Sequence, residues 1–402
     1  MSGKMATSVE LALKGGPPVR RSSLPYGHQW LDDDDIAAVV EVLRSDWLTT
    51  GPRIAEFEQA FAELVGTKEA VAVSNGTAAL HAAIYALNIG PGDEVIVPAM
   101  TFAASANCVV YQGGTPVFAD VDAPTLLLDP EQVEAKITPR TKAIIAVDYA
   151  GQACDYDELK EIASRRGLSL IADACHAIGG SYKSRPVGSL AHLSTFSFHP
   201  VKHITTGEGG MISTNDPVLA QRMRTFRNHG ITSDHRQREA QGSWFYEMVD
   251  LGYNYRLTDF QCALGVRQLR RLPAWVGRRQ EIARRYDIAF AAIPEVKALA
   301  VRSNVSHAYH LYVIRLETEK LSADRATIFS ALRAEGIGVN VHYIPVPWHP
   351  YYQSLGYEKG QWAVAESAYE RIISLPIFPA MSDCDIEDVI QAVTKVISAY
   401  RQ

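Results

Sequence analysis

The stretch EAVAVSNGTAALHAAIYALNIGPGDEVIVPA, residues 69–99, decides the fold. It joins a short apolar run, a turn of small residues, a helix-like segment and a second apolar run. Neither run alternates apolar with polar side chains, so both faces of each strand are expected to be buried. Such strands are typical of a parallel sheet that helices cover on both sides. The stretch therefore predicts the first strand–helix–strand unit of an α/β sheet.

The same alternation continues along the chain. Further strands are predicted near residues 115–121, 141–151 and 168–174, and helix-forming stretches separate them. Shorter strand-like pieces follow at residues 194–199 and 210–215. These patterns predict one α/β sheet as the centre of the first domain.

A second domain is predicted after a long helical signal from residue 258 toward residue 293, which Pro273 is expected to interrupt. Two strands, HAYHLYVIRL (307–316) and GVNVHY (338–343), are expected to pair there with three helices, at residues 325–336, 362–373 and 386–400. We therefore expect three parts, a lead-in over 1–22, a large domain over 23–265 and a small C-terminal domain over 266–402 that includes the connecting helix.

The composition limits the class of protein. The 402 residues are 47% hydrophobic, and 39 Lys and Arg against 45 Asp and Glu give a net charge of −6 that is spread along the chain. A nucleic-acid partner is therefore not expected. No apolar run has the length of a membrane span and no secretory leader is evident, so we expect a soluble, cytoplasmic protein without a membrane partner. The five cysteines form no CxxC pair and are expected to be reduced and mostly buried.

Two clusters resemble metal sites only superficially. The aspartate run at residues 32–35 is better explained as the start of a helix, where carboxylates complement the helix dipole. His176, His199, His203 and His342 have no spacing that makes a compact ligand set, so no metal is expected.

Three other features carry chemistry. The turn SNG at residues 74–76 ends a strand and opens a helix, where free N–H groups and the helix dipole favour a phosphate, although the same residues are ordinary helix caps. Asp173 closes an apolar strand at the edge where α/β sheets bind ligands, with a helix cap or a structural hydrogen bond as the alternative. Lys202 lies in the Gly- and Thr-rich segment SFHPVKHITTGEGG (197–210), which has no packing reason to prefer lysine. An amine, a carboxylate and a phosphate turn match the aldehyde, ring nitrogen and phosphate of pyridoxal 5′-phosphate (PLP).

With these residues the chain resembles the DegT/DnrJ/StrS group of PLP-dependent nucleotide-sugar aminotransferases, from about residue 24 to its C-terminus. The resemblance implies the fold type I of PLP-dependent transferases, which is similar to aspartate aminotransferase. Its large domain has a mixed, mostly parallel sheet with helices on both faces, and its smaller C-terminal domain is α+β. The matching segments are WLTTGP (47–52), NGTAAL (75–80), PAMTFAASAN (98–107), VDYAG (147–151), DACHAIG (173–179), SFHPVKHITTGEGG (197–210) and GYNYRLTDFQCALG (252–265).

The resemblance implies a role for each matching residue. Lys202 forms a Schiff base with PLP, and Asp173 pairs with the pyridinium nitrogen. Phe102 stacks on the ring face, with a place in the core as its alternative, and His176 lies near the ring hydroxyl. Asn254 reaches the phosphate of the neighbouring subunit, so the active site requires a homodimer. The phosphate is otherwise held by Gly76, Thr77, Ala78 and Ser197.

The implied reaction moves an amino group from glutamate to the C4 ketone of a UDP-linked 4-keto-6-deoxy-N-acetylhexosamine. Some related sugar dehydratases carry histidine in place of the lysine, so Lys202 argues against that reaction. Two alternatives stay open, an aminotransferase for another keto-sugar nucleotide (dTDP-linked or 3-keto) and a non-enzymatic regulator on the same scaffold. The expected contacts to the sugar nucleotide are Tyr26, Thr50, His342 and Tyr343.

Overall fold

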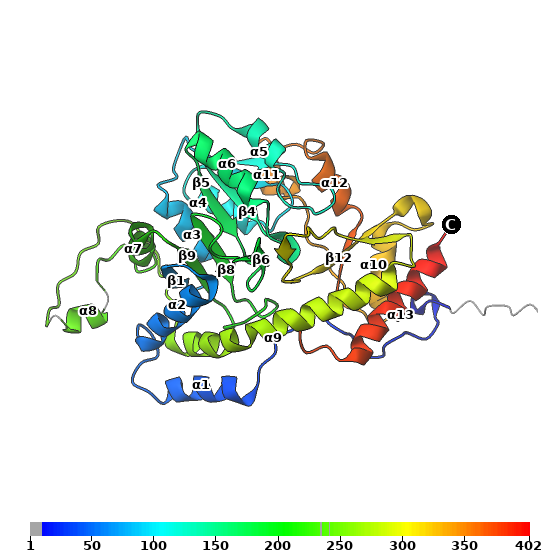
Figure 1. Ribbon diagram of the computed structural model, residues 1–402, viewed down its shortest axis with the longest axis horizontal. Helices are drawn as coiled ribbons and strands as arrows, with labels where there is room; N and C mark the ends of the chain where they lie inside the picture. Colours follow the sequence, from blue (N-terminus) through cyan, green and yellow to red (C-terminus); the bar gives the residue numbers. More distant parts are fainter. Residues whose placement is uncertain (1–9, 234, 241) are drawn as a thin grey trace, which may run out of the picture.

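A seven-stranded sheet forms the centre of the computed structural model, which describes residues 10–233, 235–240 and 242–402 (Figure 1). The strands are ordered β1-β9-β8-β5-β4-β2-β3. Neighbours from β8 to β3 are parallel, whereas β9 is antiparallel to both β8 and β1, which confirms the mixed, mostly parallel sheet. Their bounds are β1 (Glu69–Val73), β2 (Glu94–Pro98), β3 (Thr115–Ala119), β4 (Thr141–Val147), β5 (Ser169–Asp173), β8 (Leu193–Ser197) and β9 (Gly210–Thr214).

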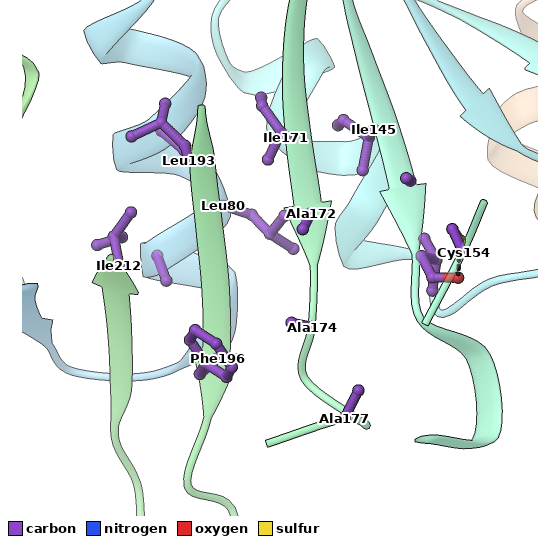
Figure 2. Close-up of a cluster of buried hydrophobic side chains, with 14 of the residues drawn as sticks. Leu80, Ile145, Cys154, Ile171, Ala172, Ala174, Ala177, Leu193, Phe196 and Ile212 are labelled. Atoms are coloured by element: carbon purple, nitrogen blue, oxygen red, sulfur yellow. Dashed lines mark hydrogen bonds between the residues drawn. The ribbon is translucent and has the colours of Figure 1, made fainter. Parts of the chain in front are cut away.

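Both faces of this sheet are covered, since every residue of β2 and of β9 is buried. Figure 2 shows the packing at the centre, where Leu80 of the helix over residues 76–86 points toward the strands that carry Ala172 and Leu193. None of the helices in the described ranges is long and apolar enough to cross a membrane. The surrounding helices are α2 (Pro52–Val65), α3 (Gly76–Ala86), α4 (Ala104–Tyr111), α5 (Pro130–Lys136), α6 (Tyr156–Arg166) and α7 (Pro217–Phe226).

A second hydrophobic core lies beside the first and surrounds a small antiparallel sheet of order β10-β12-β13. Its strands are β10 (Val296–Ala298), β12 (Tyr312–Leu316) and β13 (Ile372–Leu375), and helices α10 (Arg325–Ala334) and α13 (Asp383–Tyr400) pack on it. A third small sheet joins the two regions through β6 (Ser181–Tyr182), β7 (Arg185–Pro186) and β11 (Val305–Ser306). The remaining elements are α1 (Asp33–Leu43), α8 (His235–Ala240), α11 (Pro350–Ser354), α12 (Ala363–Tyr369) and four short 3₁₀ turns, Ala12–Lys14, Tyr149–Gly151, Thr318–Lys320 and Val346–Trp348.

The long helix α9 (Asp259–Phe290) runs through both cores without a break (Figure 1). The predicted interruption at Pro273 is therefore wrong. Proline removes one helical N–H donor, but Leu272, Trp275 and Val276 are buried on both sides of it and fix the two halves in one line. The predicted domain border at residues 265/266 falls inside this helix and stays a prediction.

The C-terminal half differs from the prediction in two places. Residues 338–343 do not form a strand, because only Asn340 makes a bridge, to Ser374. Residues 346–372 return to the large core, where the indole of Trp362 donates to the carbonyl of Phe118 at 3.0 Å. The carboxylate of Asp120 accepts the N–H groups of Val364 and Ala365 at 2.9 Å each and so caps α12.

The aspartate run behaves as the helix-start interpretation predicts. Asp32 caps α1 and forms a capping box with Asp35. Arg271 of α9 contacts both carboxylates, which ties α1 to the long helix. All five cysteines are free, and Cys108, Cys154 and Cys262 are buried, as predicted.

A buried carboxyl group follows β4. One oxygen of Asp148 accepts hydrogen bonds from the backbone of Cys154 and the hydroxyl of Tyr156, both at 2.9 Å. Its other oxygen has no partner among the described residues. Burial raises the pKa of Asp148 from its ordinary 3.8 to about 7.

This pKa predicts a pH dependence of stability. Between about pH 4 and pH 7 the folded state keeps the Asp148 proton and the unfolded state loses it, so stability falls as the pH rises, by about 4 kcal/mol at most. Asp148→Asn removes this contribution. Urea unfolding at about pH 5 and about pH 8 should therefore show a smaller loss of stability for the variant than for the parent. Equal losses in the two proteins would contradict the assignment.

Candidate active site

A cavity of about 1040 Å³ lies at the edge of the sheet where β5 and β8 end. It is lined by the start of α3, the segment after β2, the loop that carries Lys202 and residues 340–343. A cavity at the carboxyl ends of parallel strands is the usual ligand site of open α/β sheets. The sequence-predicted residues that line it are Tyr26, Gly76, Thr77, Ala78, Phe102, Asp173, His176, Ser197, Lys202, His342 and Tyr343.

Lys202 projects from a closed loop between β8 and β9. The N–H of Phe198 donates to the carbonyl of Gly209 at 2.8 Å, which joins the two ends of the loop, and the N–H of Lys202 donates to the carbonyl of His199 at 2.8 Å. Burial lowers the pKa of the Lys202 amine from its ordinary 10.5. A lysine with a lowered pKa supplies more neutral amine, the form that acts as a nucleophile or base.

Asp173 ends β5 with a carboxylate that is only 6% exposed. The hydroxyl of Ser105 donates to one oxygen at 2.7 Å, and the N–H of Cys175 donates to the other at 3.3 Å. Thr101 in turn lies 2.8 Å from the Ser105 hydroxyl. These contacts orient the carboxylate toward the cavity that Lys202 also lines, and they compensate part of its desolvation.

The turn before α3 has the geometry of an anion cradle. A Cβ atom on Gly76 would lie 2.9 Å from the Cβ of Ser197, so only glycine allows this approach. The side chain of Asn75 already accepts the N–H of Ala78 at 2.8 Å. The described residues offer no acceptor to the N–H groups of Gly76 and Thr77, which therefore stay available for a phosphate.

Three rings form a chain that ends at Lys202. The hydroxyl of Tyr343 lies 3.0 Å from Nε2 of His176, and the His176 ring lies 4.3 Å from the ring of His310. Nε2 of His310 is 3.5 Å from Nζ of Lys202. Burial lowers the pKa of both histidines well below 6.5, so both rings are neutral near pH 7.

Other polar and aromatic side chains line the same cavity. The His342 ring lies 5.3 Å from the ring of Tyr26, and its Nδ1 lies 2.8 Å from the hydroxyl of Ser374. Phe102 is 58% exposed and lies 5.9 Å from the Tyr343 ring, so its alternative interpretation as a core residue is wrong. An aromatic ring exposed in a cavity is suited to stacking on a flat ligand.

Two predicted site residues lie elsewhere. Thr50 lines a separate cavity of about 230 Å³ together with Arg227 and Arg256. Asn254 is exposed and does not line the Lys202 cavity, although Tyr253 and Tyr255 on either side of it do.

Sequence reasoning missed Ser105, Asn340 and His310. Ser105 belongs to a matching segment, PAMTFAASAN, so that segment held a signal. His310 falls in the segment predicted as a strand at residues 307–316. No sequence pattern around it indicates a contact with Lys202, which lies 108 positions away. Within the described ranges, His, Cys, Asp and Glu side chains form no group of three or more that has the arrangement of a metal site.

The residues present fit PLP. The cavity offers the amine of Lys202 for its aldehyde, the carboxylate of Asp173 for its ring nitrogen, and the cradle at Gly76 beside Ser197 for its phosphate. The Gly76 cradle is a feature of the backbone itself, because a side chain there would fill the space.

Comparisons with known proteins agree with this fit. The sequence pattern of the DegT/DnrJ/EryC1/StrS aminotransferase family matches residues 29–394. The Bacillus subtilis spore coat polysaccharide biosynthesis protein SpsC is 44% identical over 381 residues, 94% of this chain and 98% of SpsC.

Solved structures give the same result. Spr1654 from Streptococcus pneumoniae superposes in its PMP form with a TM-score of 0.89 at 35% identity, over 94% of this chain and 99% of that one. Its PLP form gives a TM-score of 0.88. PseC from Helicobacter pylori, an aminotransferase involved in the biosynthesis of pseudaminic acid, gives 0.88 at 33% identity, over 94% of this chain and 100% of PseC. The chain therefore belongs to the DegT/DnrJ/EryC1/StrS aminotransferase family of PLP-dependent sugar aminotransferases.

Proposed function

We propose that this protein moves an amino group from glutamate to the C4 ketone of a UDP-linked 4-keto-6-deoxy-N-acetylhexosamine. The product is an amino sugar for a surface glycan or for a nonulosonic acid such as pseudaminic acid. The observation that carries the proposal is that Lys202, Asp173 and the Gly76 cradle line one cavity. The likeness to PseC supports the choice of substrate class.

The cofactor residues have defined tasks in this proposal. Bound PLP supplies an electrophilic carbon and a ring that accepts electrons. Asp173 keeps the ring nitrogen protonated, because its buried carboxylate stabilises a positive charge beside it. Lys202 would hold the aldehyde carbon, and its free amine would move a proton as general base and acid, for which its lowered pKa is suited. Phe102 stacks on the ring face.

Three polar side chains of the cavity are assigned to the sugar nucleotide. His342, Tyr26 and Asn340 present hydrogen-bonding groups on the side of the cavity formed by residues 340–343. Burial lowers the pKa of His342 to about 3, so it is a neutral partner for sugar hydroxyl groups. His176 lies against His310, with ring centroids 4.3 Å apart, and is assigned to the polar edge of the cofactor ring.

We further propose a homodimer with shared active sites. The segment that includes α8 extends away from the sheet (Figure 1) and exposes apolar side chains that a second copy would bury. The partner subunit's Asn254 would then reach the phosphate. The exposed side chains are Trp244, Phe245, Tyr246, Met248, Val249 and Leu251, with Trp244 at 84% exposure.

The identity to SpsC supports an alternative substrate. SpsC is 44% identical and is named for spore coat polysaccharide biosynthesis, whereas PseC is 33% identical. The alternative is therefore a different keto-sugar nucleotide, and the sequence leaves dTDP-linked and 3-keto sugars open.

The substrate is tested by product mass. The purified protein, PLP and glutamate are incubated with a panel of UDP- and dTDP-linked 4-keto and 3-keto sugars. The mass of each product is then measured by mass spectrometry. We expect amine transfer to the UDP-linked 4-keto-6-deoxy-N-acetylhexosamine to be the fastest reaction. A faster reaction with a dTDP-linked or 3-keto sugar would establish the alternative, and no transfer to any sugar would contradict both.

Lys202→Ala is expected to abolish the colour of bound PLP and to lower the rate of amine transfer by about 100-fold or more, because it removes both the covalent anchor and the general base. Visible absorbance and the same mass assay measure the two effects. Lys183→Ala is the matched control, since Lys183 is an exposed lysine that pairs with Asp157 on the surface. A coloured, fully active Lys202→Ala variant would refute the assignment.

A further inference from the structure

We propose that His310 is a positioning residue that holds the amine of Lys202 in the direction required for proton transfer. This inference rests on the proposed function, because it deepens the role given to Lys202 there. His310 is the side chain that the structure places at the reacting nitrogen and that sequence reasoning did not find.

The direction of the contact follows from the protonation of Lys202. When its amine is protonated it carries only donors, so its N–H donates and Nε2 of His310 accepts, at 3.5 Å. A neutral imidazole that accepts at Nε2 carries its proton on Nδ1. The His310 ring is 4% exposed, and its Nδ1 has no partner among the described residues. Burial, together with the nearby Lys202, His176, His203 and Arg279, holds the pKa of His310 well below 6.5, so the acceptor persists near pH 7.

Neighbouring rings hold the imidazole in place. The His176 ring lies 4.3 Å from it and is itself fixed by the Tyr343 hydroxyl at 3.0 Å from its Nε2. The His203 ring lies 5.8 Å away, and its Nε2 lies 2.9 Å from the carbonyl of Ala308. These contacts restrict rotation of His310 away from Lys202.

The backbone of His310 is held from two sides. Arg279, fully buried in α9, donates through one nitrogen to the carbonyls of Tyr309 at 3.1 Å and His310 at 3.3 Å. On the other side the N–H of Leu311 donates to the carbonyl of Ala150 at 3.1 Å. A Cβ on Gly151 would lie 2.7 Å from the Tyr309 nitrogen, so this approach requires glycine.

A purely structural role explains these contacts less well. A buried polar ring with an unpaired nitrogen costs stability that an apolar side chain of the same size would avoid. The retained polar atom is the one that faces Lys202 and the cavity. A released lysine amine on a flexible four-carbon chain has many rotamers, and an acceptor at Nζ selects one of them.

The test compares variants that keep or remove the acceptor. His310→Phe and His310→Leu remove it, and His310→Gln restores an amide oxygen near the position of Nε2. His307→Asn is the matched control, because His307 is a buried neighbour whose Nδ1 accepts the N–H of Tyr309 at 2.9 Å and for which no contact with Lys202 is seen in the described structure. Asparagine keeps that acceptor. The use of two apolar variants keeps the test valid if one of them does not fold.

Two readouts report on Lys202 directly. In protein freed of cofactor, the rate at which added PLP regains its bound absorbance measures capture by the amine. In the loaded enzyme, the rate of colour loss with glutamate, compared with α-deuterated glutamate, measures the proton transfer. We expect His310→Phe and His310→Leu to slow both by about 10- to 100-fold and to increase the isotope effect. His310→Gln should recover most of both rates, and His307→Asn should match the parent.

Apolar variants that capture PLP at the parental rate with an unchanged isotope effect would overturn the inference. So would a His310→Gln variant as slow as His310→Phe, since that result indicates a packing role. Failure of the proposed function has a different signature, because the parent itself would then not lose its colour with any amino donor.

Discussion

A carboxylate buried at the end of a parallel strand is the constraint on which the site depends. Moving a charge out of water is costly unless donors and a cation surround it. Ser105 and the backbone of Cys175 supply the donors to Asp173. Neither is a full countercharge, and the cavity on its open side is also lined by Lys202. The protonated ring nitrogen of PLP is the cation that we propose for this position.

The two hydrophobic cores are connected at this same place. The buried Arg279 of α9 donates to the carbonyls of Tyr309 and His310, and also to that of Ile377 at 2.8 Å. Burial lowers the pKa of this guanidinium to about 9, which leaves it charged near pH 7. The helix that passes through both cores thus also fixes the segment that approaches Lys202. The packing of α9 therefore affects the position of the segment that contacts Nζ of Lys202.

The sequence predicted the features that depend on residues close together in the chain. Apolar strands and small-residue turns indicated the sheet, and strand ends placed Asp173 and Lys202 at one edge because parallel strands end together. Contacts between distant segments were not predictable in this way. His310 approaches Lys202 across 108 positions, and the continuity of α9 at Pro273 depends on the packing of Trp275 and its neighbours. Thr50 lies in a matching segment but lines another cavity of its own chain.

We propose that one nitrogen, Nζ of Lys202, is the covalent anchor of PLP. Reduction of the PLP-loaded protein with borohydride makes that link permanent, and peptide mass mapping then locates it. We expect a single pyridoxyl group on the peptide that contains Lys202. A modification on any other lysine, or none on a protein that transfers amino groups, would contradict it.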